Sequence, residues 1–170
     1  PHGMWPSEGG VSRSALKLLA EHGCEWTATG QAVLANSLRR ELNDNPLPGS
    51  SGYLYKPYLV ETGGKPIHCF FRDDRLSDKI GFEYTKWHGR DAVADFVRSL
   101  EDIRRNADPA LDPVVSVILD GENCWEHYEH NGDVFLDAFY GDLERRAELR
   151  AVTVSEFLEG RRPAATLARL

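Results

Sequence analysis

The chain has 170 residues, of which 41% are apolar and 28% are charged, and its formal net charge is −7. This composition is that of one ordinary soluble globular domain and excludes the disordered and fibrous classes. Nucleic acid is not expected as a partner, because phosphate binding needs a clustered excess of Lys and Arg that this acidic chain lacks.

The sequence carries no signal for a membrane segment or a disulfide framework. No apolar run approaches the roughly 18 residues that cross a bilayer, and the first residues lack the pattern of a signal peptide. Cys24, Cys69 and Cys124 are far apart and form no CxxC pair. We therefore expect a cytoplasmic protein with no membrane partner. Because the chain begins without Met on residues that look functional, we also expect a fragment of something longer.

The first half of the chain alternates helical and strand patterns. Leu16, Leu19 and Ala20 recur at helical spacing and Gly23 follows as a stop signal. Pro57 restricts the segment around it to the edge of a sheet. In chain order, the predicted elements are a helix over 12–22, a strand over 24–28, a helix over 31–42, an exposed loop over 43–52, an extended edge segment over 53–60 and a strand over 66–71.

The second half contains the clearest helix and the clearest strand. Over 91–106, apolar residues share one helical face and two arginines fall in the last turn. The β-branched run "VVSVILD", 114–120, is typical of a parallel strand buried on both faces. The remaining predicted elements are a helix over 134–149, a strand over 150–154 and a helix over 155–159 capped by Ser155. Strands that alternate with helices predict an α/β fold with parallel strands.

Polar residues cluster at the chain start and after two predicted strands, as "HGMWPSEGG", "FFRDDRLSDKIGF" and "DGENCWEHY". Ligand sites of α/β sheets and barrels form at the carboxyl ends of strands. Alone, Glu8 is interpreted as a surface residue near a helix start and Asp120 as a turn residue at a strand exit. Together, beside Trp and Tyr, they form the carboxyl pair that cleavage of a glycosidic bond needs.

The other polar groups favour structural interpretations. The cluster of Arg72, Asp73, Asp74 and Asp78 is either a metal site or an ion-paired turn, and we favour the turn. His68 lies inside an apolar strand, which is typical of a core histidine. Three tryptophans are expected to be partly buried, namely Trp26, Trp87 and Trp125, and such a ring binds sugar only where one face stays open.

Four motifs in order resemble glycoside hydrolase family 57, the retaining enzymes of α-glucans. They read "GMWPSEGGVS", "EWTATGQAVLANSL", "FFRDDRLSDKIGFEY" and "VSVILDGENCWEHY". The resemblance is greatest to the amylopullulanase-like members, and it covers roughly residues 3–157. Any one of these motifs alone would not be specific, whereas four in the same order are.

The resemblance implies a (β/α)7 barrel, an incomplete TIM-like barrel in this chain, and a double-displacement mechanism without a catalytic metal or cofactor. The Glu of the "WPSEG" motif, here Glu8, would be the nucleophile, and the Asp of the "LDGEN" motif, here Asp120, the general acid/base. The residues that would line the sugar subsites are Trp5, Trp26, His68, Arg72, Asp73 and Trp125. An α-glucan or oligosaccharide is the implied substrate.

Two departures from the family pattern bear on these expectations. Thr29 is followed by Gly30 and Gln31, where relatives commonly carry Asp and Glu. The family's His-Gln-Pro motif does not precede the first residues, so residues 1–170 would form a single segment of the catalytic domain, the C-terminal half of the barrel. Neither the α-1,4 or α-1,6 linkage, nor hydrolysis against transglycosylation, nor the oligomeric state can be read from these residues.

Two alternatives stay open at this point. One is a metal-dependent polysaccharide hydrolase or deacetylase on a similar incomplete barrel, with ligands from His68, Asp73, Asp74 and His127. The other is a non-catalytic carbohydrate-binding piece in which Trp5, Trp26 and Trp125 stack on sugar.

Overall fold

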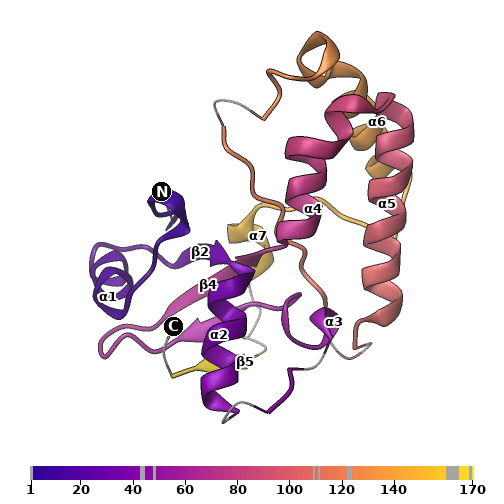
Figure 1. Cartoon of the computed structure of the whole chain (residues 1–170). Helices are drawn as coiled ribbons and strands as arrows, with labels where there is room; N and C mark the ends of the chain where they lie inside the picture. The colour runs from indigo at the N-terminus through magenta and orange to yellow at the C-terminus, as the bar shows by residue number, and fades with distance from the viewer. Residues whose placement is uncertain are drawn as a thin grey trace.

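The computed structural model describes residues 2–42, 45–47, 49–108, 110, 112–121, 124–159, 165–168 and 170. Within them, one sheet has the strands β1 (Gly3–Met4), β2 (Trp26–Gly30), β3 (Tyr58–Val60), β4 (Ile67–Arg72) and β5 (Ala165–Leu167). Its spatial order is β1-β2-β4-β3-β5 (Figure 1). The neighbours β1, β2 and β4 run parallel, and β3 is antiparallel to β4 but parallel to β5. The predicted α/β class with mainly parallel strands is confirmed.

The strand β3 lies inside the sheet, so the predicted edge position of 53–60 is wrong. Only Tyr58–Val60 is extended, and it pairs with β4 on one side and β5 on the other. Pro57 directly precedes this strand. Its missing N–H therefore removes no bond from the ladder, which is why a proline beside the strand is compatible with an interior place.

The run 114–120 does not form the doubly buried strand that its β-branched residues predict. Ser116 makes a single parallel bridge to Arg72, and residues 113–119 are partly exposed. Among the described residues, no strand pairs with its other side. Beyond that bridge, the side chains of Arg72 and Ser77 bond the backbone of Ile118 in place of further backbone pairing with β4. The run therefore lies beside β4 as an extended segment with one neighbour.

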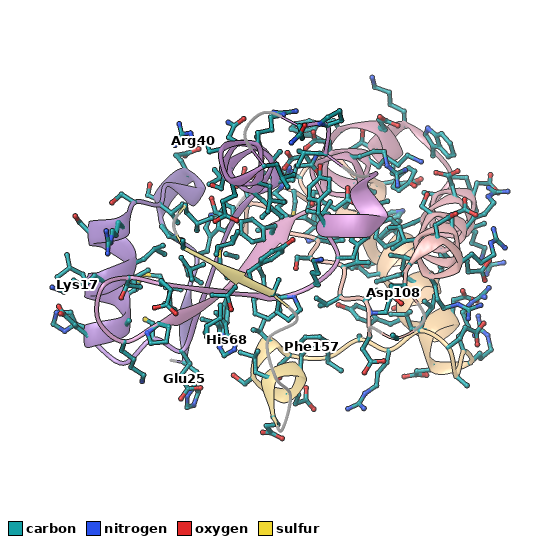
Figure 2. The ribbon with its side chains drawn as sticks, turned by 90° about the horizontal axis from the view of Figure 1, so that it is seen from below. Lys17, Glu25, Arg40, His68, Asp108 and Phe157 are labelled. Carbon is teal, nitrogen blue, oxygen red and sulfur yellow. The ribbon has the colours of Figure 1, made fainter. Side chains whose placement is uncertain are left out.

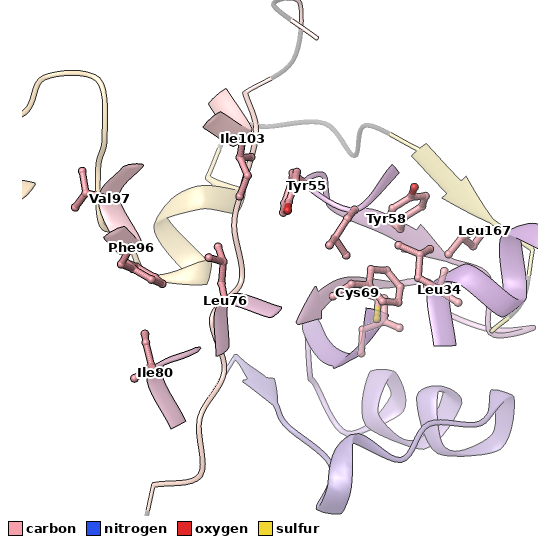
Figure 3. Packing of buried hydrophobic residues seen from close by; sticks show 14 of the residues in the cluster. Leu34, Tyr55, Tyr58, Cys69, Leu76, Ile80, Phe96, Val97, Ile103 and Leu167 are labelled. Carbon is pink, nitrogen blue, oxygen red and sulfur yellow. The ribbon is translucent and has the colours of Figure 1, made fainter. Parts of the chain in front are cut away.

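Helices cover the sheet and build a second layer beside it. The first two are α1 (Arg13–Glu21), capped by the Ser12 hydroxyl, and α2 (Gln31–Glu41), both as predicted to within two residues. Leu16 and Leu34 from these helices share one buried cluster with Cys69 of β4; Leu34 and Cys69 are labelled in Figure 3. Each such buried side chain stabilises the fold by about 1.5–3 kcal/mol.

The second layer centres on α5 (Gly89–Asn106) and α6 (Asp133–Glu144), which lie side by side (Figure 1). Phe96 and Phe139 meet edge to face between them, with ring centroids 5.3 Å apart. The predicted helix over 91–106 is confirmed. The one predicted over 134–149 ends early, at Glu144, where polar residues replace the apolar stripe. No described helix combines the length and the apolar character that crossing a bilayer requires.

Several short elements differ from the sequence predictions. The loop over 43–52 lies partly outside the described residues, and its end forms α3 (Ser50–Tyr53). Residues 150–153 form no strand, and α7 (Val154–Leu158) is capped by Thr153 rather than Ser155. Thr153 and Glu156 make a reciprocal capping box, which explains the earlier start.

The other face of the sheet carries a smaller apolar cluster. Because side chains alternate along a strand, Trp26 and Ala28 of β2 share this face with His68 and Phe70 of β4. Phe157 of α7 packs on it, with its ring 6.0 Å from that of Phe70. Figure 2 shows His68 and Phe157 on the same side of the ribbon.

A chain of short helices connects β4 to α5. These are α4 (Asp74–Asp78), the π-helical turn η2 (Lys79–Glu83) and the 3-10 turn η3 (Tyr84–Lys86). Asp95 of α5 fixes this connection, since one of its oxygens accepts from Lys79 Nζ at 2.6 Å and from the Tyr84 hydroxyl at 2.7 Å. Hydrogen bonds from Lys79, then from Tyr84, hold the pKa of the Asp95 carboxyl below its ordinary value.

Replacing Asp95 by Asn is expected to lower the free energy of unfolding by about 1–2 kcal/mol at neutral pH. Because the pKa of Asp95 is lowered by folding, its contribution is complete above the unfolded pKa and is lost as the pH falls through the folded value. The difference between parent and variant should therefore shrink below about pH 4. Denaturant unfolding at pH 7 and pH 3 measures this.

The matched control is Asp102→Asn on the same helix. Asp102 pairs with Arg105 on an exposed surface, so the change should cost under about 0.5 kcal/mol at either pH. Equal effects of the two substitutions would show that Asp95 does not anchor the connection.

Candidate active site

The parallel strands end at one edge of the sheet, and the polar motifs follow these ends. The register aligns Met4 with Thr27 and Gly30 with Arg72, and Ser116 bridges to Arg72. The residues just beyond are Trp5 to Glu8 after β1, Gln31 after β2, Asp73 and Asp74 after β4, and Asp120 after the extended run. These segments therefore lie at one edge of the sheet, where the parallel strands end.

A hollow of about 310 Å³ lies at this edge. Its lining is formed by Trp5, Arg72, Ser77, Gly81, Phe82, Ile118, Leu119, Asp120, Cys124 and His127. Three of these residues, Trp5, Arg72 and Asp120, were candidates for the sugar site, and His127 was a candidate ligand of the metal alternative. A larger surface hollow of about 750 Å³ is lined by residues of α5, α6 and the two arginines that follow α6. Because that one contains no strand-end residue, we assign the candidate site to the smaller hollow.

Glu8 lies on the loop that carries Trp5 but is not among the residues lining the hollow. It is exposed, and its backbone is left-handed, with φ 54° and ψ 22° inside the turn η1 (Ser7–Gly9). A non-glycine residue in this region costs energy, and such strained residues are enriched at functional sites. The strained backbone makes Glu8 more than an ordinary surface glutamate.

Gly9 holds the Glu8 loop in place. Its φ is +64°, and a Cβ there would come within 2.8 Å of the Trp5 ring. Its carbonyl accepts a hydrogen bond of 2.6 Å from the buried Thr29 hydroxyl of β2. Only glycine fits both the backbone angle and the close tryptophan, so "WPSEG" fixes Trp5 and Glu8 on one short loop.

Arg72 joins the third motif, "FFRDDRLSDKIGFEY", to the fourth, "VSVILDGENCWEHY". Its Nε donates to the Ile118 carbonyl at 2.9 Å, two residues before Asp120. Its terminal nitrogens pair with Asp74 at 2.8 Å and Asp78 at 2.7 Å. Burial lowers the pKa of this guanidinium, but the hydrogen bonds that it donates to the two carboxylates more than offset this effect and raise the pKa. The ion-paired turn expected for these acids is present.

Ser77 also bonds the backbone of the segment that precedes Asp120. It is buried in α4, and its hydroxyl accepts the Ile118 N–H at 3.2 Å. Directly after β4, the Asp73 N–H donates to the Ser116 carbonyl at 2.9 Å. Both polar backbone groups of Ile118 are thus bonded by side chains from the β4–α4 connection, which sets where Asp120 emerges.

Asp73 is a structural support in this arrangement. Its side chain is only 2% exposed. One carboxylate oxygen caps α4 through the Leu76 N–H, and the other accepts the Tyr55 hydroxyl, each at 2.8 Å. Burial, and then the bond to Asp73, raise the pKa of Tyr55. Since protein donors reach both oxygens and Asp73 does not line the hollow, a direct sugar contact stays a prediction.

Trp26 and His68 lie side by side on neighbouring strands, away from the hollow. The Trp26 indole covers Gly3, where a Cβ would be 2.1 Å from the ring. Trp26 Nε1 and His68 Nε2 are buried without a hydrogen-bond partner. Such atoms are uncommon in complete interiors. Their predicted subsite roles remain predictions, and the structure places both residues on the face that α7 covers.

Trp125 is also packed rather than open to the hollow. Its ring lies 5.2 Å from Tyr128 and 5.8 Å from Phe135, and it covers Gly132. It lies within the fourth motif, yet His127, two residues later, is the one that lines the hollow. The partly buried state expected for this tryptophan is present, and its sugar contact stays a prediction.

The metal alternative lacks a gathered set of ligands. Within the part of the chain that the structure describes, no three His, Cys, Asp or Glu side chains come together in a metal-binding arrangement. The proposed ligands are dispersed: Asp74 pairs with Arg72, Asp73 caps a helix, His68 faces α7 and His127 lines the hollow. The geometry gives this alternative no support.

The site includes residues that the sequence reasoning missed. Ser77, Gly81 and Phe82 line the hollow, and all three come from the "LSDKIGF" part of a quoted motif. A serine in a polar turn and a phenylalanine among apolar residues carry no signal of their own. Gly81 and Phe82 are placed by the π-helical turn, which sequence periodicity does not reveal.

Comparisons with known proteins show the family and the fold of this chain. Residues 1–168 match the sequence model of Glycosyl hydrolase family 57. No curated protein matches the sequence significantly. Two solved structures are similar to nearly the whole chain. The 4-α-glucanotransferase from Thermococcus litoralis has a TM-score of 0.73 and 21% identity, over 99% of this chain and 24% of its own. The α-amylase AmyC from Thermotoga maritima has a TM-score of 0.69 and 18% identity, over 99% and 42%.

At these identities, the likeness to the two structures shows the fold. The chain spans less than half of either structure. It is an α/β segment with a mainly parallel sheet, and it corresponds to part of a (β/α)7 barrel.

Proposed function

This chain belongs to glycosyl hydrolase family 57, and from that membership we propose that it supplies both catalytic carboxyl groups of a retaining enzyme acting on α-linked glucans. The observation that carries the proposal is the shared hollow: Trp5 and Asp120, from opposite parts of the sequence, line it together. Glu8 sits three positions after Trp5 on the same fixed loop. The two similar structures are a 4-α-glucanotransferase and an α-amylase, which fits this substrate class.

The proposed reaction has two steps. In the first, the Asp120 carboxylic acid gives its proton to the leaving glycosidic oxygen while a Glu8 oxygen bonds the anomeric carbon and the glycosidic bond breaks. In the second, the Asp120 carboxylate takes a proton from an incoming hydroxyl, whose oxygen bonds the anomeric carbon as the bond to Glu8 breaks. The incoming group attacks from the face that the leaving group left, so the α-configuration is retained.

Two displacements on one anomeric carbon require the carboxyl groups of Glu8 and Asp120 about 5–5.5 Å apart when substrate is bound. The bonds from Thr29 to Gly9 and from Arg72 and Ser77 to Ile118 fix the two loops that carry them. Both acids are exposed, so sugar can reach either one.

The two similar structures are a transferase and an amylase, and the same first step serves both outcomes. The difference lies in whether water or a sugar hydroxyl reaches the glycosyl intermediate. We propose glycosyl release or transfer on α-glucans as the activity class and leave linkage choice to the measurement.

The test is to incubate the full-length protein with maltooligosaccharides and with a branched glucan, following products by chromatography and the first-formed anomer by NMR. We expect α-configured products, with longer oligosaccharides appearing if transfer competes with hydrolysis. First-formed β-anomers would contradict the double displacement. Sugar binding without any product would instead favour the non-catalytic binding alternative.

A further inference from the structure

One aromatic ring at the hollow is exposed far beyond what packing explains. Phe82 is 71% exposed, the largest value among the bulky apolar side chains that the structure describes as exposed. It lines the same hollow as Trp5 and Asp120. A large apolar side chain that is exposed beside a polar hollow indicates a binding surface, because contact between its apolar surface and water is unfavourable.

The ring is presented by a turn that is anchored on both sides. Next to Phe82, the π-helical turn buries Ile80, whose carbonyl accepts the Tyr128 hydroxyl at 2.5 Å. At its ends, Lys79 and Tyr84 both bond Asp95 of α5. Single π-helical turns occur frequently at functional sites. The exposure of Phe82 therefore belongs to a fixed backbone and not to a loose loop, so little order is lost when a ligand covers the ring.

The hollow has the mixed chemistry that a sugar ring requires. Two aromatic rings, Trp5 and Phe82, contribute apolar faces, while Arg72, Asp120 and His127 contribute polar groups. A pyranose presents C–H faces that pack on aromatic rings and a rim of hydroxyls that hydrogen-bond polar groups. A wholly apolar ligand would bury the Asp120 carboxyl group without offering it a hydrogen bond, which disfavours such a ligand.

Resting on the proposed function, we propose that Phe82 is a substrate-binding residue that stacks on a glucosyl unit of the α-glucan, as a second aromatic wall beside Trp5. The residue sets affinity for the oligosaccharide and takes no part in bond making or breaking. Its contribution is to binding in the ground state and the transition state alike, so losing it raises KM and leaves kcat nearly unchanged.

The experiment measures maltoheptaose binding by calorimetry in the full-length protein carrying Asp120→Asn, which removes turnover. In that background, Phe82→Ala is expected to weaken binding about tenfold, whereas Phe82→Tyr keeps a ring and stays within about twofold. The matched control is Tyr140→Ala, since Tyr140 is 55% exposed on α6 and outside this hollow. It should leave the affinity unchanged. In the active protein, in which Asp120 is unchanged, Phe82→Ala should raise KM by the same factor.

The outcomes separate the two proposals. If maltoheptaose binds and Phe82→Ala leaves its affinity unchanged, the stacking role is wrong while the proposed function stands. If Phe82→Ala lowers kcat and not KM, the binding role is also wrong. If neither the Asp120→Asn protein nor the parent binds any α-glucan, both proposals fall. Thermal unfolding of each variant confirms that the exposed side chain is not needed for folding.

Discussion

Glu8→Gln and Asp120→Asn are each expected to remove nearly all turnover of maltooligosaccharides while leaving the fold intact. Losing the nucleophile should lower kcat by about 10⁴-fold or more, and losing the general acid/base by about 10²–10⁴-fold. Both side chains are exposed, so amide replacements disturb no packing. Steady-state kinetics and thermal unfolding measure the two effects separately. Glu129→Gln, an equally exposed carboxylate on the segment after Asp120, is the control and should change neither.

The two roles can be told apart by an activated substrate and by azide. The nitrophenol of a nitrophenyl α-maltoside departs without a proton from an acid. Asp120→Ala should therefore release nitrophenol in the first step at a rate close to that of the parent, whereas Glu8→Ala should not. Azide should then give an α-glycosyl azide with Asp120→Ala, because it replaces water on the Glu8-bound sugar. With Glu8→Ala, direct attack from the opposite face should give a β-glycosyl azide. A β-azide from Asp120→Ala together with an α-azide from Glu8→Ala would show that the nucleophile and the acid/base are the other way round. Near-normal activity in either variant would show that these two residues are not the catalytic pair.

Periodic helices were the most predictable part of the fold. The stripes of α1, α2 and α5 set their bounds to within about two residues, since each helix buries one face against a neighbour. The run 114–120 was not predictable, because a β-branched sequence specifies extended backbone but not how many strands lie beside it. Segments elsewhere in the sequence decide that, and here the side chains of Arg72 and Ser77 bond Ile118 where the pairing with β4 has ended.

The site was predictable where chemistry follows a strand end. Trp5, Arg72 and Asp120 meet because parallel strands end at one edge. Trp26 and Trp125 could not be placed by the same rule, since alternation along β2 and packing onto Phe135 decide which way their rings face. Phe82 was invisible in sequence because only the π-helical turn brings it to the hollow.

Arg72→Ala is expected to lower both stability and kcat, because this side chain connects the β4 exit to the segment before Asp120. The substitution leaves the Ile118 carbonyl without its charged donor, which costs about 1.5–3 kcal/mol. The two ion pairs add little, since Asp78 is half exposed and screened by solvent. Arg72→Lys keeps the charge but lacks the planar fork that reaches three acceptors at once, so it should recover only part of the loss. Denaturant unfolding measures this effect, with Arg98→Ala as the exposed control that should cost under about 0.5 kcal/mol.

The kinetic effect of Arg72→Ala separates positioning from a general loss of stability. A displacement of Asp120 by about 1 Å is enough to lower the rate about 10²-fold at temperatures where the variant remains folded. Because the displaced group is the acid of the first step, the loss should be large for maltooligosaccharides and small for the burst of nitrophenol released in the first step from the nitrophenyl α-maltoside, whose departure needs no proton. A variant that is merely less stable would lose both activities by the same factor. Equal losses on the two substrates would therefore show that Arg72 supports the fold and does not position Asp120.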